Sequence, residues 1–413
     1  MSDTAQSEQH TPLAGIRVLE LGNYIAAPTA GRLLADFGAE VIKIERPGTG
    51  DEVRRWRLPR GSTSMLFRTL NRHKRSVALD LRSPAGREAV LALAARSDVV
   101  IENFRPGTLE KWGLGPAQLE AANPDLVLCR ISAFGQTGPL SSRPGFAAVA
   151  EAYGGLRELV GDPDRPPVRV GVSIGDSIAG IYAAFGAVME LFARQSARLA
   201  GRRPPRLGDR VVDVALNESI LSVMESLLPD ADAYGTQRTR TGGRMEGIAP
   251  SNAYVCGDGR SVVIAGNGDS IFARLMDLIG RPDLRDDPAL AANDERWRRR
   301  EELDAAIGEW TAARPQADVL ADLAARDIPA GPIYTAADIA ADEQYAARNM
   351  VQRRTASTGN EELEGIAFPG IVPVYGGRSG EIGSLGPELG ADTRAVLTEV
   401  CGMDAAQLQR VLP

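Results

Sequence analysis

One acidic residue is set apart by its surroundings. Asp176 lies in the stretch VGVSIGDSIAG, which is apolar, rich in glycine and otherwise uncharged. An isolated carboxylate at this place has two interpretations. It caps the N-terminus of the helix that follows, or it is a nucleophile that attacks an activated carbonyl such as a thioester and divides an acyl exchange into covalent steps. On the residues alone the helix cap is the simpler interpretation, and both stay open.

A second group of polar residues follows predicted strands. Arg46 follows IKIE, Arg82 follows ALDL, and Asn103, Phe104 and Arg105 follow DVVIE. In an open α/β sheet ligands bind at the carboxyl ends of the strands, so these side chains are expected to meet at one site. Such a site would suit a phosphate-bearing cofactor. The alternative is that each arginine is an ordinary surface residue.

A dinucleotide site is disfavoured by the glycine pattern. Glu45 ends the second predicted strand, where a ribose-binding acid would stand. However, Gly15, Gly22 and Gly31 do not have the GxGxxG spacing that lets a backbone approach a pyrophosphate. A GxxxxGK[ST] phosphate loop is also missing from the sequence.

Composition narrows the class of protein. The net charge of -7 argues against binding to nucleic acid, which requires a basic field. Cys129, Cys256 and Cys401 are far apart in the chain and predict reduced thiols in the cytoplasm, with no disulfide or zinc framework. With only His10 and His73, mechanisms that need two histidines are nearly excluded. The N-terminus lacks the features of a targeting peptide, and no run of about 18 apolar residues suggests a membrane span.

The elements that must position these residues alternate between strand and helix. Apolar runs at 16–21 and 40–44 flank a helical segment at 29–37, and the pattern continues with strands at 76–80, 98–102 and 126–131. Alternation of this kind predicts an α/β fold with a doubly wound parallel sheet. A long apolar helix at 177–195 follows Asp176 and is expected to be buried on most sides.

At 413 residues, two domains are expected. The basic run at Arg296 to Arg300 is interpreted as a solvated helix face. The predicted organisation is a disordered N-terminus at 1–12, a large domain at 13–228, a linker at 229–245, a smaller α+β domain at 246–340, and a C-terminal segment at 345–413 that returns to the large domain.

Six ordered motifs resemble the class III CoA-transferases, the family that includes formyl-CoA:oxalate and carnitine CoA-transferases and the α-methylacyl-CoA racemases. They extend from near Gly15 to the C-terminal part of the chain. They read LLADFGAEVIKIERPGTGD, NRHKRSVALDL, VIENFRPGTLEKWGLG, ISAFGQTGP, GVSIGDSIAG and IPAGPIYTAADI.

The resemblance implies a Rossmann-like large domain built from both ends of the chain, a smaller central domain, and a homodimer of interlocked chains with the active site at its interface. It implies that Asp176 is the catalytic aspartate. CoA contacts carry over to Ile25, Ala26, Arg46, Leu79, Asp80, Leu81, Arg82, Asn103, Phe104, Arg105, Lys111 and Arg143, with Arg46 and Arg105 serving the nucleotide half. The substrates would be an acyl-CoA and a carboxylic acid, with no metal, nucleic acid or membrane involved.

The implied mechanism is covalent. Asp176 attacks the donor thioester to give a mixed anhydride, the released CoA thiolate then forms an aspartyl-CoA thioester, and the acceptor carboxylate reverses the sequence. The glycine-rich backbone at Gly266 to Gly268 is a candidate donor to the tetrahedral intermediates. A helix N-terminus at Asp176 would favour the ionised nucleophile.

Departures from the family pattern narrow the choice of activity. Racemases of the family carry a histidine where this sequence aligns Phe146, and oxalate enzymes carry a glutamine where Ile25 stands. Two alternatives remain besides the transferase: an isomerase of the racemase type and a CoA-binding protein without catalysis.

The segments 165–176 and 247–269 look most like those of transferases that act between succinyl-CoA and larger acids such as glutarate, malate, itaconate or benzylsuccinate. A second carboxylate on the acceptor would require an arginine, for which Arg68, Arg169 and Arg244 are candidates.

Overall fold

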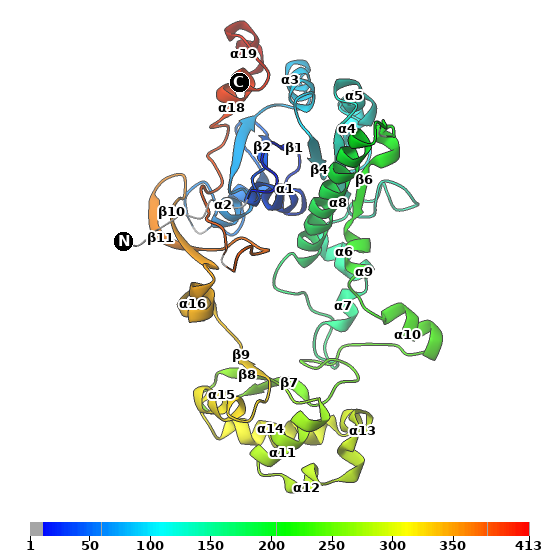
Figure 1. Cartoon of the computed structure of the whole chain (residues 1–413), viewed down its shortest axis with the longest axis vertical. Coiled ribbons are helices and arrows are strands. Elements are labelled where there is room, and N and C mark those ends of the chain that lie inside the picture. The colour runs from blue at the N-terminus through cyan, green and yellow to red at the C-terminus, as the bar shows by residue number, and fades with distance from the viewer. Residues whose placement is uncertain (1–10, 59, 204, 378, 413) are drawn as a thin grey trace. The chain divides into compact units, whose positions relative to one another are not determined.

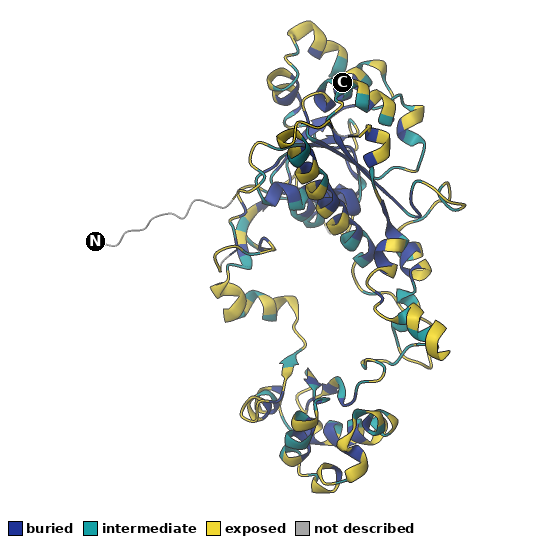
Figure 2. Ribbon diagram, turned by 45° about the vertical axis from the view of Figure 1, so that its right-hand side comes forward, coloured by how far each residue is buried: buried dark blue, intermediate teal, exposed yellow. Residues whose placement is uncertain are grey.

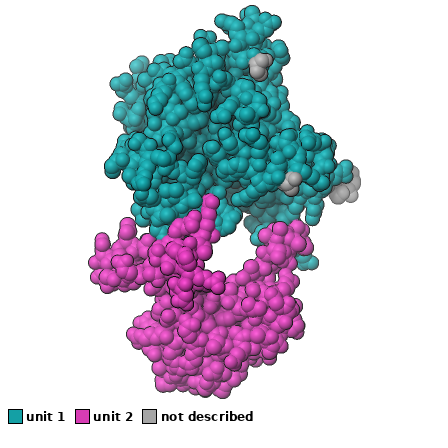
Figure 3. All heavy atoms as spheres, turned by 180° about the vertical axis from the view of Figure 1, so that it is seen from behind, with its two compact units in different colours: residues 1–156, 170–225, 342–413 teal, residues 157–169, 226–341 magenta. Residues whose placement is uncertain are grey.

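The computed structural model describes residues 11–58, 60–203, 205–377 and 379–412. Most of the N-terminal stretch predicted to be disordered therefore lies outside the described residues. The chain folds into two compact units, which Figure 1 shows as ribbons and Figure 3 distinguishes by colour. Unit 1 comprises residues 1–156, 170–225 and 342–413, and unit 2 comprises residues 157–169 and 226–341. The short segment 157–169 thus joins the second unit, whereas the sequence had placed it in the large domain.

A six-stranded parallel sheet forms the centre of unit 1, with strand order β3-β2-β1-β4-β5-β6. The order reverses between β1 and β4, which is where ligands bind in doubly wound sheets. The prediction of an α/β fold with a parallel sheet is confirmed. The strands are β1 (Arg17–Glu20), β2 (Glu40–Glu45), β3 (Lys74–Ala78), β4 (Val99–Glu102), β5 (Val127–Ser132) and β6 (Val212–Ala215).

Both faces of this sheet are covered by helices. Successive strand residues point to opposite sides, so neighbouring residues of one strand belong to different cores. Val18 and Val41 belong to a core with the helices α1 and α8, whereas the next residues, Leu19 and Ile42, belong to a core with α3 and α5. The helices of this unit up to α9 are α1 (Ala26–Asp36), α2 (Met65–Leu70), α3 (Pro84–Ala94), α4 (Thr108–Lys111), α5 (Pro116–Ala122), α6 (Ala147–Tyr153), α8 (Ile174–Leu199) and α9 (Leu216–Leu221).

Helix α8 is longer than predicted, and it is not buried on most sides. Small residues such as Gly180, Ala183 and Ala187 are buried against α1 and the sheet. The opposite side of the helix, yellow in Figure 2, exposes large apolar side chains, so the predicted burial is wrong for the single chain. By length and composition alone α8 could also cross a membrane, although core helices pass the same test.

The C-terminal segment returns to unit 1. It contributes the hairpin of β10 (Val351–Ser357) and β11 (Glu362–Pro369) and the helices α17 (Glu343–Ala347), α18 (Thr393–Glu399) and α19 (Ala405–Val411). Buried cations hold it in place: the Arg68 and Arg72 guanidinium groups donate to backbone carbonyls of Gly386 and Gly370. These buried contacts help attach the C-terminal segment to the sheet domain.

Unit 2 has its own core around an antiparallel sheet of β7 (Ser251–Val255), β8 (Ser261–Ala265) and β9 (Ala330–Pro332). Its helices from α10 on include α10 (Leu227–Tyr234), α11 (Asp269–Leu278), α12 (Pro282–Arg285), α13 (Asn293–Arg298), α14 (Arg300–Ala312), α15 (Gln316–Ala324) and α16 (Ala336–Ala341). The predicted strand at 261–265 is present, while the range expected to be a linker, 229–245, contains most of α10.

One prediction for unit 2 is wrong. Arg296 does not lie on a solvated face, because it is 1% exposed. Its guanidinium donates to the carbonyls of Leu290 and Asn267 and to the carboxylate of Asp269, and it stacks on Phe272. The run of charged residues in this helix therefore includes one buried cation, Arg296, which connects α13 to the loop before α11.

Candidate active site

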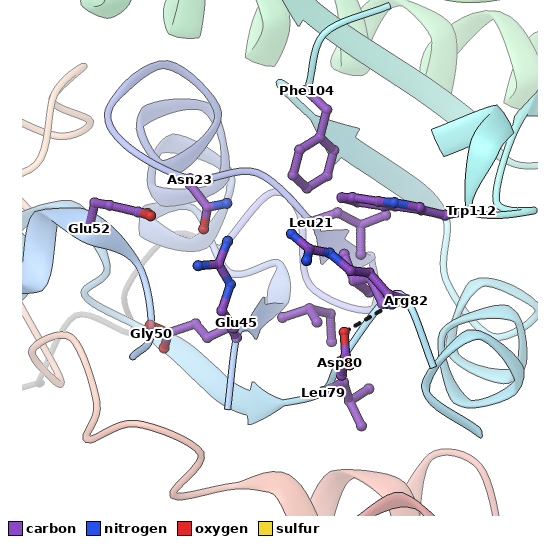
Figure 4. A pocket seen from close by; sticks show the side chains of 13 residues that line it. Leu21, Asn23, Glu45, Gly50, Glu52, Leu79, Asp80, Arg82, Phe104 and Trp112 are labelled. Carbon is purple, nitrogen blue, oxygen red and sulfur yellow. Dashed lines mark hydrogen bonds between the residues drawn. The ribbon is translucent and has the colours of Figure 1, made fainter. Parts of the chain in front are cut away.

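A pocket lies at the carboxyl ends of β1, β2, β3 and β4 in unit 1 (Figure 4). Six of the predicted CoA contacts line it, namely Arg46, Leu79, Asp80, Leu81, Arg82 and Phe104. The remaining lining residues are Leu21, Asn23, Ile44, Glu45, Gly50, Glu52 and Trp112. Its two arginines can bind a phosphate group, although the carboxylates of Glu45, Glu52 and Asp80 also line the pocket.

The turn after β3 is shaped by local hydrogen bonds. The Asp80 carboxylate accepts from the Arg82 N–H at 3.0 Å, the contact dashed in Figure 4, and the Ser83 hydroxyl caps α3 through the Gly86 N–H. Gly86 has to be a glycine, since a Cβ there would collide with the Asp80 backbone. The turn directs the Arg82 side chain toward the space in front of Trp112 and Phe104.

Two aromatic rings form one wall of the pocket. Phe104 and Trp112 pack edge to face with their centroids 5.0 Å apart. Trp112 was not among the predicted site residues, although it directly follows Lys111. An aromatic residue beside a cation could have indicated a site for a planar ligand. Such rings offer a stacking surface for a base.

A buried ionic network supports this wall. The Glu102 carboxylate accepts from the Phe104 N–H at 2.7 Å and from Arg130 at 2.6 Å, and Arg130 also binds Glu110 at 2.7 Å. Burial raises the pKa of Glu102 to about 7, although Arg130 acts in the opposite direction. Glu102 therefore fixes the backbone at the start of the Phe104 loop.

The other predicted CoA contacts do not line this pocket. Ile25 caps α1, where it is 6% exposed, and Ala26 is the first residue of that helix. Arg105, Lys111 and Arg143 are exposed, and Arg143 donates to the Tyr153 hydroxyl at 2.9 Å. Their proposed role in CoA binding stays a prediction.

Asn103 already has structural partners. Its side-chain Oδ1 accepts from the Asn23 backbone N–H at 2.9 Å, and its side-chain Nδ2 donates to the Asn23 backbone carbonyl at 2.7 Å. The approach depends on Gly22, because a Cβ there would lie 2.7 Å from the Asn103 carbonyl oxygen. Asn103 therefore holds the loop that follows β1.

Asp176 occupies the third position of α8, within the first turn of the helix. The N-cap is Ser173, so the interpretation of Asp176 as the helix cap is wrong. Its half-buried carboxylate nevertheless lies in the first turn, where the free N–H groups and the helix dipole favour an anion. One turn later, a Cβ on Gly180 would lie 2.7 Å from the Ala26 carbonyl oxygen, so the start of α8 packs directly on the start of α1.

The residues near the start of α8 do not supply a histidine. Phe146 caps α6, and the Cβ of the next residue, Ala147, lies 3.7 Å from the position that a Cβ on Gly175 would take. In the part of the chain that the structure describes, the one histidine is His73, whose Nε2 accepts from the Gly383 N–H while Nδ1 lies 3.2 Å from Asp36. His73 is thus engaged in the fold.

The three arginines considered for an acceptor carboxylate lie in different surroundings. Arg68 is 4% exposed and donates to the Ser357 carbonyl and to Glu388. Arg244 binds the Asp304 carboxylate at 2.6 Å. Arg169 is exposed and lies in unit 2. Within the described residues, no group of three or more His, Cys, Asp or Glu side chains is placed to hold a metal ion.

A doubly wound sheet, a pocket with two arginines and an aromatic wall, and a carboxylate at a helix N-terminus suit an enzyme that binds a nucleotide-linked substrate and attacks it with a carboxylate. Comparison with known proteins identifies the class further. Residues 13–393 match the model of CoA-transferase family III.

The chain is 42% identical over 405 residues to a succinyl-CoA–D-citramalate CoA-transferase of Chloroflexus aurantiacus, covering 96% of this chain and 97% of the relative. It is 38% identical to the beta subunit of a succinyl-CoA–L-malate CoA-transferase of the same organism, with 96% of each chain covered.

Among solved structures, a CaiB/BaiF family protein from Brucella suis superposes with a TM-score of 0.81 at 34% identity, over 95% of this chain and 100% of the other. The chain therefore belongs to CoA-transferase family III, and it is an acyl-CoA:carboxylate CoA-transferase. The resemblance drawn from its motifs is confirmed.

Proposed function

We propose that the protein transfers CoA from succinyl-CoA to a dicarboxylic acid through a covalent intermediate on Asp176. Two relatives with almost complete coverage are named for succinyl-CoA as donor and for a substituted dicarboxylic acid as acceptor. The observation that carries the covalent step is the position of Asp176 in the first turn of α8, where the helix dipole favours an ionised carboxylate that can act as a nucleophile.

The reaction is a series of exchanges at acyl carbons. An oxygen of Asp176 attacks the thioester carbonyl of succinyl-CoA, the carbon–sulfur bond breaks, and a mixed anhydride and the CoA thiolate result. The thiolate attacks the Asp176 acyl carbon and releases succinate, which leaves an aspartyl-CoA thioester. The acceptor carboxylate attacks this thioester and displaces the thiolate, which then attacks the acceptor acyl carbon of the new anhydride and restores the Asp176 carboxylate. No net proton or electron is consumed.

The pocket in unit 1 would hold the nucleotide end of CoA. Arg46 and Arg82 face a space bounded by Phe104 and Trp112, which suits phosphate groups beside a purine. The segment 23–26 links the two parts of the site, because Asn23 lines the pocket and Ala26 packs on α8 one turn after Asp176.

The test is an exchange assay. The protein is incubated with succinyl-CoA and a panel of dicarboxylic acids, among them citramalate, malate, glutarate and itaconate, and new acyl-CoA species are identified by mass spectrometry. Asp176→Asn should abolish exchange, while Glu190→Gln on the same helix should retain it. Hydroxylamine added during turnover should modify the peptide that contains Asp176.

Three results would contradict the proposal: exchange that survives in Asp176→Asn, a hydroxylamine adduct on another peptide, or no exchange with any acid. Incorporation of deuterium at the substrate α-carbon without exchange would favour the isomerase. Tight CoA binding with neither reaction would favour a binding protein.

We further propose that a second copy of the chain covers the exposed side of α8. Seven large apolar residues on this one helix are at least 37% exposed, more than a solvated helix in a monomer displays. They are Ile181, Tyr182, Phe185, Val188, Met189, Phe192 and Leu199. One relative is a beta subunit of a transferase that also has an alpha subunit, so the assay must separate a homodimer from a mixed assembly.

Light scattering of the purified protein should give the mass of two chains, and the double change of Phe185 and Phe192 to Glu should give one. The same change at Val372, an exposed apolar residue outside α8, should leave the mass unaltered. If the two chains are interlocked, differently tagged dimers should exchange subunits only after unfolding. A wild-type monomer would contradict this proposal and leave the chemistry of Asp176 untouched.

A further inference from the structure

Three aromatic side chains form a row in unit 1 outside the hydrophobic cores. The Tyr24 ring lies in the middle, 5.4 Å from the Trp56 ring and 5.9 Å from the Phe146 ring, measured between centroids. Trp56 is 40% exposed and Phe146 is 66% exposed. Rings that contact one another while remaining open to solvent form a surface, and a core would have buried them.

Tyr24 has a backbone conformation that a bulky residue rarely adopts. Its φ is 66°, in the left-handed region where a side chain costs free energy. The Tyr24 N–H donates to an Asp51 carboxylate oxygen at 3.1 Å, and Asp51 is in turn paired with the buried Lys43 at 2.9 Å. The preceding residue, Asn23, is held on both sides by Asn103. The surrounding structure thus imposes the conformation and fixes the direction of the ring.

Tyr24 lies between the two parts of the proposed site. On one side, its neighbour Asn23 lines the pocket, and the charges of Glu52 and Arg46, which also line the pocket, are close enough to act on the phenol. On the other side, the Tyr24 ring touches Phe146, the residue before α6, and α6 packs against the first turn of α8. Along this row a ligand can extend from the pocket toward Asp176.

We propose that Tyr24, with Trp56 and Phe146 on either side, is the surface on which the pantetheine arm of acyl-CoA lies, and that the Tyr24 ring positions the thioester for attack by Asp176. The inference rests on the proposed function for the identity of the ligand. A pantetheine arm has many rotatable bonds, so a rigid aromatic surface that immobilises it increases the fraction of bound substrate in a reactive geometry. The same rings exclude water from the reactive acyl carbon.

Two substitutions separate the ring from the backbone. Tyr24→Gly removes the ring, and because glycine adopts a positive φ without strain, the relief of backbone strain offsets part of the stability lost with the ring contacts. Tyr24→Phe retains the ring and removes the hydroxyl. The two variants therefore isolate the contribution of the aromatic surface without a general loss of structure.

The first measurement is binding, which does not depend on turnover. Calorimetry gives the Kd of CoA and of adenosine 3′,5′-bisphosphate, which is the nucleotide end without the arm. In Tyr24→Gly the Kd of CoA should rise about tenfold, as expected for loss of one aromatic contact, while that of the bisphosphate stays at the wild-type value. Tyr24→Phe should keep the wild-type ratio of the two constants.

The second measurement is the fate of succinyl-CoA. In Tyr24→Gly the kcat for transfer should fall more than the KM for succinyl-CoA rises, and hydrolysis of succinyl-CoA per transfer event should increase because the thioester is less well placed and less protected. A purely structural role for Tyr24 would lower the amount of active protein without changing this ratio of hydrolysis to transfer.

The inference is wrong if Tyr24→Gly binds CoA and the bisphosphate with the wild-type ratio, or if both constants rise equally. Should that variant fail to fold, Phe146→Ala, which removes an exposed ring, has to show the same selective loss of CoA affinity. If the proposed function is wrong, the wild type shows no exchange of CoA between acids. The ratio of the Kd values of CoA and the bisphosphate still tests the aromatic row in that case.

Discussion

Glu102 is a carboxylate whose protonation should affect stability near neutral pH. Burial raises its pKa to about 7 in the folded protein, so between pH 4.5 and 7 the folded state binds more protons at this group than the unfolded state. Stability from this group is therefore highest below that window and is lost as the pH rises through it. We expect wild type to gain up to about 3 kcal/mol of unfolding free energy relative to Glu102→Gln as the pH falls from 7.5 to 4.5.

The measurement is urea unfolding of both proteins at a series of pH values. Arg130 and Glu110 are present in both, so their titration largely cancels in the difference. The same substitution at the exposed Glu362 should give a difference that does not vary with pH. If the difference in unfolding free energy between wild type and Glu102→Gln does not vary with pH, folding does not raise the pKa of the Glu102 carboxyl.

Trp112 should contribute to binding at the opposite end of the ligand from Tyr24. Trp112→Leu removes the ring that packs on Phe104 but retains apolar volume. We expect the Kd of adenosine 3′,5′-bisphosphate and of CoA to rise together by roughly 5- to 100-fold, the range for loss of a base–aromatic stack. Calorimetry checks this, with Trp297→Leu in unit 2 as the control. Unchanged bisphosphate binding would place the base elsewhere.

At the scale of single residues, the sequence predicted position better than role. Arg46, Arg82 and Phe104 could be predicted at one pocket because each follows a strand, and parallel strands end at a common edge. Asn103 also follows a strand, but its side chain binds the backbone of Asn23 and does not line the pocket. The two residues are eighty positions apart, so the local sequence pattern could not predict this contact. For the same reason the burial of Arg296 could not be inferred from its charged neighbours.

At the scale of the element, the contact between α1 and α8 determines where Asp176 lies. Gly180 is at its centre, since a Cβ there would come within 2.7 Å of the Ala26 carbonyl and of Thr29. Gly180→Ala should therefore displace the start of α8, lower the unfolding free energy by about 1 to 3 kcal/mol and reduce kcat.

Gly308 in α14 provides the matched comparison. Apart from its chain neighbours and its own helix backbone, no heavy atom lies within 4 Å of a Cβ at this position, so Gly308→Ala should stabilise the protein by as much as about 1 kcal/mol through helix propensity. Thermal unfolding of both variants checks the pair. Equal effects of the two substitutions would show that α1 and α8 can separate without cost.

The sequence of α8 predicted a helix, but not which of its sides is covered. Its small residues, Ala179 and Ala183 among them, are buried in the single chain, whereas Phe185 and Phe192 are exposed. Hydropathy does not distinguish a side that packs on the same chain from a side left for a partner, because both are apolar. Residue size is the better signal here, since close helix packing requires small side chains.

At the scale of the whole molecule, alternation of strands and helices was enough to predict the parallel sheet, because right-handed crossovers leave few topologies. The assignment of the last residues to that sheet domain depends instead on buried long-range contacts. The Ser76 N–H donates to Asp392 at 2.9 Å, and Arg54 donates to the Pro387 carbonyl at 3.0 Å. Such pairs span more than three hundred residues and leave no local pattern.

These contacts predict that unit 1 cannot fold without its C-terminal segment. A chain that ends at Ala341 would leave the guanidinium groups of Arg72 and Arg54 buried without their carbonyl partners, at a cost of about 1 to 3 kcal/mol for each lost acceptor, and would lose β10, β11 and α18. We expect no cooperative unfolding transition for unit 1 in this fragment.

A chain that ends at Gly402 lacks only α19 and should unfold cooperatively at a lower urea concentration than the full chain. Circular dichroism during urea unfolding compares the three, and a full-length transition midpoint in the shorter fragment would show that residues 342–413 are dispensable for the sheet domain.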